Sequence, residues 1–321
     1  MSVLIFIELD EKAVRKSSLE AVYYGSKVAE MMGTSATAIA LGEADAVELA
    51  TTGRFGATKV LHAADARLNE GNTMAYASAV AAAAEKEGAS VIVLAKSALG
   101  DAMAARLAGK LKAGLAANVI DLPNVSNGFR VKRSIYTGKA FAETSLTADR
   151  KILAIKKNTI TPEEKEATAQ VEAFQPTLND ADFGAVQVTK TEKATGDVLL
   201  PEADLVVSAG RGLKGPENWG IVEDLAKALG AATACSKPVS DLDWRPHHEH
   251  VGQTGIKVSP NLYIAAGISG AIQHLAGVNS SKVIVVINKD PEAPFFKSAD
   301  YGIVGDVFDV LPRLTKAVKG S

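Results

Sequence analysis

The sequence has one cysteine, Cys235, and few aromatic residues, which make up 5% of its 321 residues. A single thiol excludes a disulfide framework within the chain, and with it the small secreted folds that disulfides hold together. Hydrophobic residues still make up 47% of the chain, so alanine, valine, isoleucine and leucine must fill the core rather than aromatic rings. This composition favours a large α/β protein over an aromatic-rich β-sandwich, and the length allows about two domains.

An excess of one charge and long apolar runs are also missing. Lys plus Arg number 35 against 37 for Asp plus Glu, so we expect no nucleic-acid partner. No apolar run is long enough to cross a bilayer, so we expect no integral membrane protein. The first twelve residues are a short apolar run followed by acids, which predicts a buried strand rather than a signal peptide. We therefore expect a cytoplasmic bacterial protein or, second, a mature chain of the mitochondrial matrix.

In the first half of the chain, runs of consecutive apolar residues alternate with amphipathic helical patterns. Such runs are typical of parallel strands covered on both faces, and the alternation predicts an open, doubly wound, mostly parallel sheet. The predicted strands are 3–9, 35–41, 59–63 and 90–95, and the predicted helices are 17–32, 44–52, 73–87 and 101–111. From residue 129 the pattern changes to three successive strands, at 129–135, 140–147 and 151–155.

Residues 161–199 are charged, threonine-rich and weakly periodic, so they are predicted to form a long surface connector. A second alternating unit follows and predicts a Rossmann-like α/β domain. Its predicted strands are 204–208, 231–235, 261–266, 282–288 and 301–304, and its predicted helices are 217–229, 269–276 and 306–318. We place the domain boundary near residue 192, between an N-terminal domain of residues 1–192, which ends in the connector, and a C-terminal domain of residues 193–321.

Residues 210–215 read GRGLKG between a predicted strand and a predicted helix, which is the context of a dinucleotide-binding fingerprint. The next strand ends in Cys235, Ser236 and Lys237, without the acidic residue expected to hold an adenosine ribose. A tight turn that needs glycine explains the motif equally well; in the functional alternative, Arg211 points at an anion. Lys237 is either a solvated loop charge or a countercharge for a ligand.

Two glycine-containing segments near the C-terminus carry polar side chains. Residues 251–255 read VGQTG and predict a tight loop that offers an amide and a hydroxyl to a heteroaromatic ring. Residues 267–274 read GISGAIQH and predict a helix start with Ser269 as N-cap, whose free N–H groups suit a pyrophosphate. Gln273 and His274 fall in the first turns. The alternatives are an ordinary polar turn and a packed structural histidine.

The remaining candidates are His247, His248 and His250, which surround Glu249 in the sequence. Imidazole and carboxylate are metal ligands, but no second ligand pair stands out, so a solvated loop is favoured over a metal site. Cys235 has neither a resolving partner nor a clear base, so a nucleophilic role is not favoured.

Residues 262–277 read LYIAAGISGAIQHLAG, and Ile-Asn follows at 287–288. Other stretches agree with this one: GRG at 210–212, VGQTG at 251–255, NKDPEAP at 288–294 and DYGIVGD at 300–306. Together they resemble the signature of the electron transfer flavoprotein alpha subunit. The motifs cover the C-terminal domain, whereas the N-terminal half matches only in architecture and length.

The resemblance implies a redox carrier with FAD in its C-terminal domain. It also implies a heterodimer with a beta subunit that holds AMP or a second FAD. Electrons would pass from dehydrogenases, such as acyl-CoA dehydrogenases, to a quinone oxidoreductase. The residues that match the family's FAD contacts are Arg211, Ser236, Lys237, Val251, Gly252, Gln253, Thr254, Ser269, Gly270, Ala271, Ile272, Gln273, His274, Asn288, Asp306 and Val307.

The resemblance also implies a role for several of these residues. Thr254 would hydrogen-bond near flavin N5, and His274 would lie near the pyrimidine carbonyl O2. Ser269 and the helix start would hold the pyrophosphate, and Asn288 and Asp306 would hold the adenosine end. We expect no catalytic or metal-ligating side chain, because in a carrier the flavin itself holds the electrons.

Lys237 and Val286 depart from the family pattern, which usually has Arg and Ala at these positions. In the family, the guanidinium lies over the flavin and stabilises the anionic semiquinone. Lysine keeps the charge but loses the planar stacking fork. We therefore expect FAD to bind with a less stabilised semiquinone and a lower one-electron potential.

Three alternatives remain open from the sequence. The first, within the family, is a subunit of an electron-bifurcating flavoprotein that oxidises NADH. The second is an NAD(P)-dependent dehydrogenase that uses the glycines of residues 210–215. The third is a nucleotide-binding module without redox chemistry.

Overall fold

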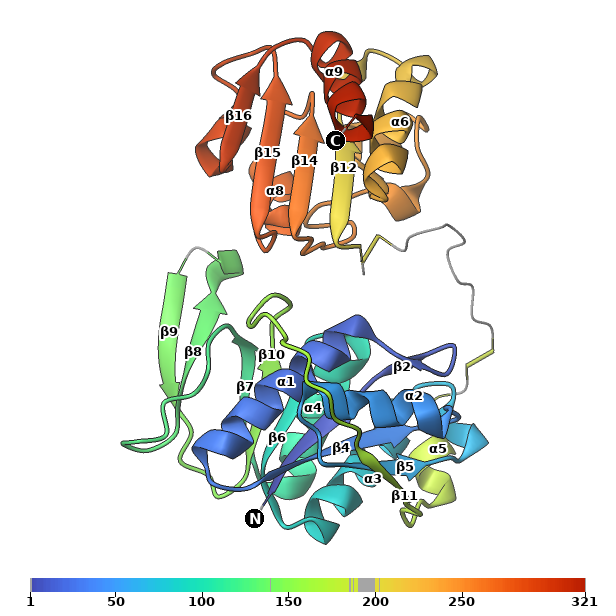
Figure 1. The fold of residues 1–321 in the computed structure, drawn as a ribbon, viewed down its shortest axis with the longest axis vertical. Coiled ribbons are helices and arrows are strands. Elements are labelled where there is room, and N and C mark those ends of the chain that lie inside the picture. The colour runs from blue at the N-terminus through green and yellow to red at the C-terminus, as the bar shows by residue number, and fades with distance from the viewer. Residues whose placement is uncertain are drawn as a thin grey trace. The chain divides into compact units, whose positions relative to one another are not determined.

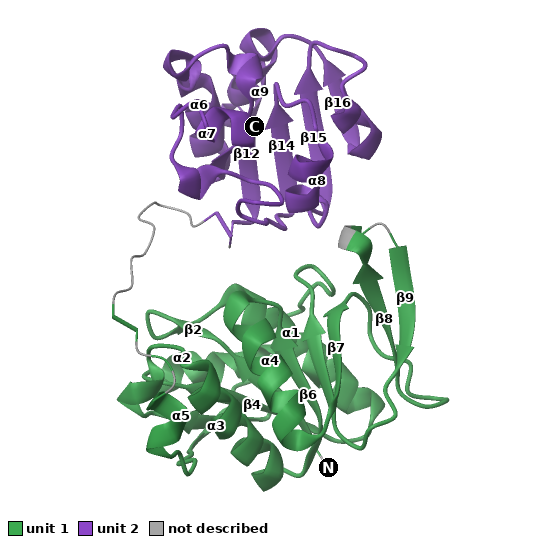
Figure 2. Cartoon of the chain, turned by 180° about the vertical axis from the view of Figure 1, so that it is seen from behind, with its two compact units in different colours: residues 1–191 green, residues 192–321 purple. Residues whose placement is uncertain are grey.

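The computed structural model describes residues 2–138, 140–184, 186, 188–189, 200–201 and 203–320. The chain divides into two compact units, residues 1–191 and 192–321, which Figure 2 colours separately. The boundary predicted near residue 192, and residues 190–199 of the predicted connector, lie outside the described residues.

Unit 1 is built on a mixed, mostly parallel sheet, with nine strands among the described residues in the order β11-β5-β4-β1-β6-β10-β7-β8-β9 (Figure 1). The strands are β1 (Ser2–Ile7), β4 (Ser35–Leu41), β5 (Lys59–Ala63), β6 (Ala89–Ala95), β7 (Gly114–Val119), β8 (Arg130–Ile135), β9 (Ala140–Ser145), β10 (Lys151–Ile155) and β11 (Gln170–Ala173). Among the described strands of this sheet, the β7–β8 and β8–β9 pairs are antiparallel and the others are parallel. A short hairpin joins β2 (Leu9–Asp10) to β3 (Ala13–Val14).

Helices cover both faces of this sheet. They are α1 (Lys16–Met31), α2 (Ala46–Ala50), α3 (Thr73–Lys86), α4 (Ala98–Leu111) and α5 (Asp180–Gly184). One core packs α1 against β1, β4 and β6, and a second core packs α3 and α4 against the opposite face. All six residues of β1 are buried, which explains why its sequence is continuously apolar. The predicted α/β class is therefore confirmed.

Several elements of unit 1, besides the β2–β3 hairpin, differ from the sequence prediction. Strand β11 lies within the predicted connector and extends the edge of the sheet, with Gln170 opposite Lys59 of β5. Its four residues include a Gln and a Glu, so it has no apolar run that would predict a strand. Its extended structure depends on pairing with β5, which is distant in the sequence. Strand β7 and the short helix α5 were also not predicted. The connector prediction is therefore wrong for residues 170–184.

Unit 2 is a parallel five-stranded sheet in the order β13-β12-β14-β15-β16. The strands are β12 (Leu205–Ala209), β13 (Ala232–Cys235), β14 (Leu262–Ala266), β15 (Val283–Asn288) and β16 (Tyr301–Val304). Helices α6 (Gly220–Leu229) and α9 (Val307–Lys319) cover one face, and α8 (Ile272–Val278) packs on the other (Figure 1). The chain winds in opposite directions on the two sides of β12, so the switch point lies between β12 and β14. In open sheets of this kind, ligands bind outside the carboxyl ends of the strands at the switch point.

Helix starts in unit 2 differ from the prediction in a way that affects the site. The helix predicted from residue 269 begins at Ile272, and the helix predicted from residue 217 begins at Gly220. Gly267 and Gly270 have φ angles of +61° and +80°, which keep the preceding segment out of the helix. Lys237 lies not in a loop but at the start of a short helix, α7 (Lys237–Ser240).

Candidate functional site

The loops that follow β12 and β14 lie against each other at the switch point. The Gly210 N–H donates to the Ala266 carbonyl (3.0 Å), and the Gly212 N–H donates to the Gly267 carbonyl (3.1 Å). A Cβ on Gly212 would come within 2.6 Å of the Gly267 Cα, so this backbone approach requires glycine. Gly210 and Gly212 therefore bring the backbones of the two loops into contact. The motif also lacks the helix start of a dinucleotide fingerprint, because α6 begins only at Gly220.

The segment after β13 places a cation at the same edge. The Ser236 N–H donates to the Ala209 carbonyl (3.1 Å), which fixes buried Ser236 beside the end of β12. Lys237 follows as an exposed side chain at the start of α7. Its charge contributes to lowering the pKa of His250, although burial of that imidazole is the larger cause. The Ser240 hydroxyl, at the end of α7, forms a hydrogen bond with His247 Nδ1 (2.7 Å), which anchors the short helix.

The 251–255 loop lies between the end of β13 and α8. The Val251 N–H donates to the Cys235 carbonyl (3.0 Å), and the Gln253 N–H donates to the Gln273 carbonyl (2.7 Å). A Cβ on Gly255 would come within 2.3 Å of the His250 carbonyl oxygen, so the tight turn requires glycine there. The loop leaves the Gln253 and Thr254 side chains exposed.

The segment after β14 turns twice before α8 begins. Gly270 rests on Phe295, since a Cβ at this position would lie 2.3 Å from the Phe295 Cβ. The Ser269 carbonyl accepts from the Phe295 N–H (3.1 Å). Ser269 was predicted as the N-cap of α8, and this is wrong: the N-cap is Ala271, and no side chain caps the helix. The prediction failed because the positive φ of Gly270 keeps residues 269–271 out of the helix.

His274 is buried rather than exposed at this edge. Its Nε2 lies 2.9 Å from the Tyr263 hydroxyl, and its ring meets Phe295 edge-on with centroids 5.7 Å apart. Burial lowers the pKa of His274 to about 4, so the imidazole is neutral at physiological pH. Tyr263 lies within the family motif of residues 262–277 but was not singled out, because it occupies an apolar position in a predicted buried strand.

Asn288 and Asp306 at the far end of the edge already make structural contacts. Asn288 Nδ2 donates to the Ile268 carbonyl (3.1 Å) and its Oδ1 accepts from the Asp290 N–H (3.1 Å), which joins the ends of β15 and β14. Asp306 caps α9 by accepting from the Phe308 N–H (3.1 Å). Each side chain retains one further hydrogen-bonding group that can contact a ligand.

The predicted contact residues therefore gather along one edge of the sheet but differ in exposure. Exposed side chains are Arg211, Lys237, Gln253, Thr254, Ser269, Ala271, Ile272 and Gln273; partly exposed ones are Asn288 and Asp306; buried residues are Ser236, Val251, Gly252, Gly270, His274 and Val307. The exposed set combines two cations, hydroxyl and amide donors and an apolar Ile272 that is 55% exposed. Such a mixture fits an anionic ligand with an aromatic ring system.

The histidine cluster and the thiol have structural explanations. Glu249 accepts from Arg245 at 2.6 and 2.8 Å, and His250 lies against Gly255. Over the described ranges, no group of three or more His, Cys, Asp or Glu side chains could hold a metal ion. Burial raises the pKa of the Cys235 thiol to about 12, which disfavours a thiolate nucleophile.

The corresponding edge of unit 1 is filled by its own side chains. Glu8, at the end of β1, is 6% exposed and accepts from the Ser97 hydroxyl at the start of α4. Arg15 lies 3.5 Å from the same carboxylate. A protein carboxylate thus lies at the helix start where a doubly wound sheet would otherwise receive an anion.

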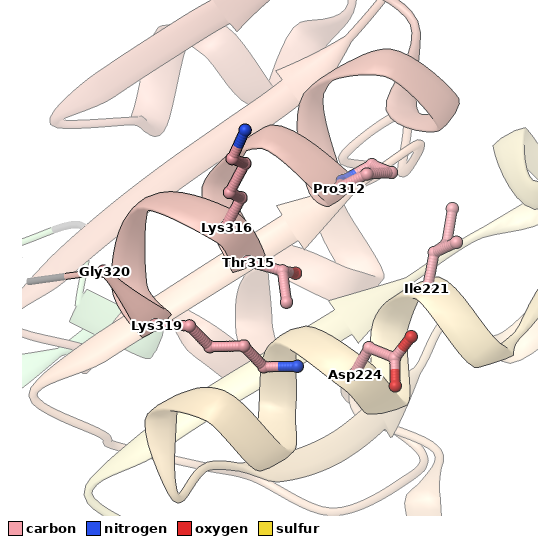
Figure 3. A pocket seen from close by; sticks show the side chains of 7 residues that line it. All are labelled: Ile221, Asp224, Pro312, Thr315, Lys316, Lys319 and Gly320. Atoms are coloured by element: carbon pink, nitrogen blue, oxygen red, sulfur yellow. The ribbon is translucent and has the colours of Figure 1, made fainter.

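The pocket drawn in Figure 3 lies away from the edge of unit 2. It has a volume of about 480 Å³ and lies between α6 and α9, lined by Ile221, Asp224, Pro312, Thr315, Lys316, Lys319 and Gly320. These residues include none of the predicted contacts. The candidate site is an open surface at the strand ends rather than this pocket. None of the helices described is both long and apolar enough to span a membrane.

Comparison with known proteins matches both units to families. Residues 3–179 match the family described as electron transfer flavoprotein domain, and residues 199–279 match electron transfer flavoprotein FAD-binding domain. The chain belongs to the electron transfer flavoprotein alpha-subunit family. The electron transfer flavoprotein subunit alpha of Bacillus subtilis is 38% identical, with 99% of this chain and 97% of the relative covered.

Other relatives share the same full-length match. The electron transfer flavoprotein subunit alpha of Syntrophomonas wolfei is 39% identical, with 98% of each chain covered, and that of Mycobacterium leprae is 35% identical, with 98% of each chain covered. The protein is therefore an FAD-binding electron carrier of the electron transfer flavoprotein type. The interpretations as an NAD(P)-dependent dehydrogenase and as a module without redox chemistry are wrong.

Proposed function

We propose that FAD binds across the carboxyl edge of the unit 2 sheet, in a heterodimer with an electron transfer flavoprotein beta subunit. One observation carries this proposal: exposed polar side chains from separate strand ends surround the switch point. At that point the loops that follow β12 and β14 are in backbone contact through their glycines. The open form of this edge suits a site that a second chain helps to cover. In unit 1, by contrast, Glu8 occupies the equivalent position.

Each group of contacts has a distinct part in holding FAD. Gln253 and Thr254 donate hydrogen bonds toward the flavin ring, and Lys237 adds a positive charge beside it. The main-chain N–H groups around Ser269 and Ala271 would hold the pyrophosphate. Bound FAD supplies the electron storage, and the side chains set its affinity and reduction potential.

Further contacts lie at the two ends of the edge. Arg211 provides a second cation next to the switch point. Asn288 and Asp306 would bind the adenosine end of FAD through the hydrogen-bonding groups that their structural contacts leave available. Val307 is buried next to Asp306 and would support this part of the site from the interior. His274 and Val251 are buried, and they would support the ring from the interior of unit 2.

The electrons come from dehydrogenases, such as acyl-CoA dehydrogenases, and leave to a quinone oxidoreductase. In this arrangement the beta subunit holds AMP, and the heterodimer carries a single FAD. The family membership supports this role, since an electron carrier needs no acid, base or nucleophile of its own.

The experiment is to purify the heterodimer with its beta subunit and determine its FAD and AMP contents. Reduction of its flavin by a substrate-reduced acyl-CoA dehydrogenase is then followed by visible absorbance. We expect FAD and AMP in equal amounts, and bleaching of the flavin band that depends on the dehydrogenase. A heterodimer with two FAD and no AMP that oxidises NADH would instead identify an electron-bifurcating flavoprotein.

A further inference from the structure

Residues 236–250 form a segment that leaves the sheet of unit 2 at the end of β13 and returns beside the same strand. Its two ends meet, because the Val251 N–H donates to the Cys235 carbonyl (3.0 Å). Lys237 lies at the start of this segment, and the 251–255 loop follows its end. The spacing between these predicted contacts of the flavin ring therefore depends on how the segment is held.

Arg245 and Glu249 form a bidentate ion pair inside this segment. The Arg245 Nε–H donates to Glu249 Oε2 (2.8 Å), and Nη2 donates to Glu249 Oε1 (2.6 Å). The Arg245 side chain is 22% exposed and the Glu249 side chain 10%. Two parallel charge-assisted bonds fix the relative orientation of the two side chains as well as their distance. Because both groups are largely withdrawn from water, breaking this pair disturbs the segment more than breaking an exposed ion pair would.

Groups from α6 and β13 hold the ion pair in place. The Arg245 Nη1 donates to Glu223 Oε1 on α6 (2.8 Å), and the guanidinium lies 5.4 Å from the ring centroid of Trp219. The Thr233 hydroxyl, on β13, donates to Glu249 Oε1 (3.3 Å). Trp219 is 3% exposed and belongs to the core between α6 and the sheet. The ion pair thus ties the segment to this helix and to the edge strand of unit 2.

Glu249 is separated from the 251–255 loop by one residue, His250. The His250 carbonyl accepts from the Ile256 N–H (2.8 Å), which closes the loop on the residue that precedes it. Gly255 rests against the same residue, since a Cβ there would lie 2.8 Å from His250 Nδ1. A change in the position of Glu249 is therefore transmitted through His250 to both ends of the loop.

The start of the segment is joined to the ion pair through His247, which lies between Arg245 and Glu249 in the sequence. His247 Nδ1 is 2.7 Å from the Ser240 hydroxyl at the end of α7, the short helix that begins at Lys237. The stretch that contains the ion pair is thus bonded to α7 on one side and continues into the 251–255 loop on the other.

We propose that Arg245 and Glu249 are positioning residues of the FAD site. Their ion pair fixes how far the charge of Lys237 lies from the Gln253 and Thr254 donors. The two side chains act on the cofactor through the segment that joins these contacts. The inference rests on the proposed placement of FAD at this edge.

The first test compares FAD dissociation constants and one-electron reduction potentials of heterodimers with the beta subunit. Glu249→Gln keeps the shape of the side chain but removes its charge, and Arg245→Lys keeps the charge but loses the planar fork. Both variants should bind FAD about tenfold more weakly and have a lower potential, because the cation and the donors no longer converge on the reduced ring. Asp224→Asn, which removes an exposed carboxylate of α6, should change neither value. Wild-type dissociation constants and potentials in Glu249→Gln and Arg245→Lys would overturn the proposal.

A second comparison separates positioning from general destabilisation. Leu225→Val shortens a core side chain of α6 that is 1% exposed, so it should lower the urea midpoint of unit 2 but leave the reduction potential unchanged. If Leu225→Val lowers the potential as much as Glu249→Gln does at an equal loss of stability, the ion pair is merely structural and the positioning role fails.

A Thr254→Val variant distinguishes failure of this inference from failure of the FAD placement. Wild-type FAD affinity in Thr254→Val would mean that FAD does not bind at this edge. Weakened binding in Thr254→Val, together with wild-type binding in Glu249→Gln and Arg245→Lys, would leave the placement intact and contradict the positioning role alone.

Discussion

Lys237 is the predicted FAD contact at which this chain departs from the family pattern, which usually has arginine. Its side chain is exposed at the start of α7, and over the described ranges no carboxylate forms an ion pair with it. Lysine offers a point charge, whereas the family's usual arginine offers a planar fork that stacks on rings. The charge at this position is kept, and the stacking is lost.

Replacing Lys237 with arginine should therefore raise the one-electron reduction potential of the bound flavin. A shift of up to about 60 mV corresponds to a tenfold change in preference for the reduced form. Potentiometric titration of the heterodimer measures it, and Lys227→Arg on the exposed side of α6 serves as control. Equal potentials for wild type and Lys237→Arg would show that the charge alone matters.

His274 makes the stability of unit 2 depend on pH. Its pKa is about 4 in the folded chain against 6.5 for the free side chain. The unfolded state binds the proton first, so the contribution is complete above pH 6.5 and is lost as the pH falls toward 4. Each pH unit in this window lowers the free energy of unfolding by at most about 1.4 kcal/mol.

Urea unfolding followed by tryptophan fluorescence reports this effect for unit 2 alone, because the only tryptophans are Trp219 and Trp244. We expect the midpoint to fall between pH 6.5 and 4 in the wild type. The slope should be smaller in His274→Gln and unchanged in the control His248→Gln, whose side chain is exposed. An unaltered slope in His274→Gln would place the titrating group elsewhere, with His250 as the next candidate, since burial also lowers its pKa.

At the scale of elements, the site depends on two loops whose backbones touch. Gly212 and Gly267 lie too close for a side chain, and Gly267 also has a φ of +61°. Gly212→Ala should push the loops apart and destabilise unit 2 by about 1–3 kcal/mol, as other overpacked positions do. FAD binding should weaken at the same time.

The matched control is Gly220→Ala at the start of α6, where a Cβ meets nothing within 4 Å. This change should leave FAD binding unaltered and stabilise the chain by up to about 1 kcal/mol, because alanine is the better helix former. Equal unfolding midpoints for Gly212→Ala and Gly220→Ala would contradict the close contact of the loops.

The same elements show what the sequence can and cannot predict. Continuous apolar runs predicted β1, β4 and β10 because burial on both faces leaves a local pattern. The edge strand β11 has no such pattern, since pairing with β5 defines it. The start of α8 was placed three residues early, because a serine before an apolar run resembles an N-cap whatever the φ of the following glycine.

At the scale of the whole molecule, the two α/β units differ in the side chains at the carboxyl edges of their sheets. The edge of unit 1 is closed by Glu8 and Ser97, whereas the edge of unit 2 leaves donors and cations exposed. The sequence motifs that predicted the family lie in unit 2 alone. The match of residues 3–179 to the electron transfer flavoprotein domain shows that unit 1 belongs to the same family. The long-range contact of Glu8 with Ser97 could not be read from either segment by itself.

The most direct measurement of the central claim is the flavin content of purified heterodimers that carry Ala271→Glu or Ala317→Glu. Both alanines are exposed in unit 2, but only Ala271 lies at the start of α8, next to the proposed pyrophosphate. A carboxylate about 4 Å from a phosphate opposes binding by about 4 kcal/mol at an effective dielectric of 20, although it does not disfavour the helix start itself. We predict that Ala271→Glu purifies folded but colourless, while Ala317→Glu keeps the flavin content of the wild type. A yellow Ala271→Glu heterodimer with full flavin content would contradict the placement of FAD at this edge.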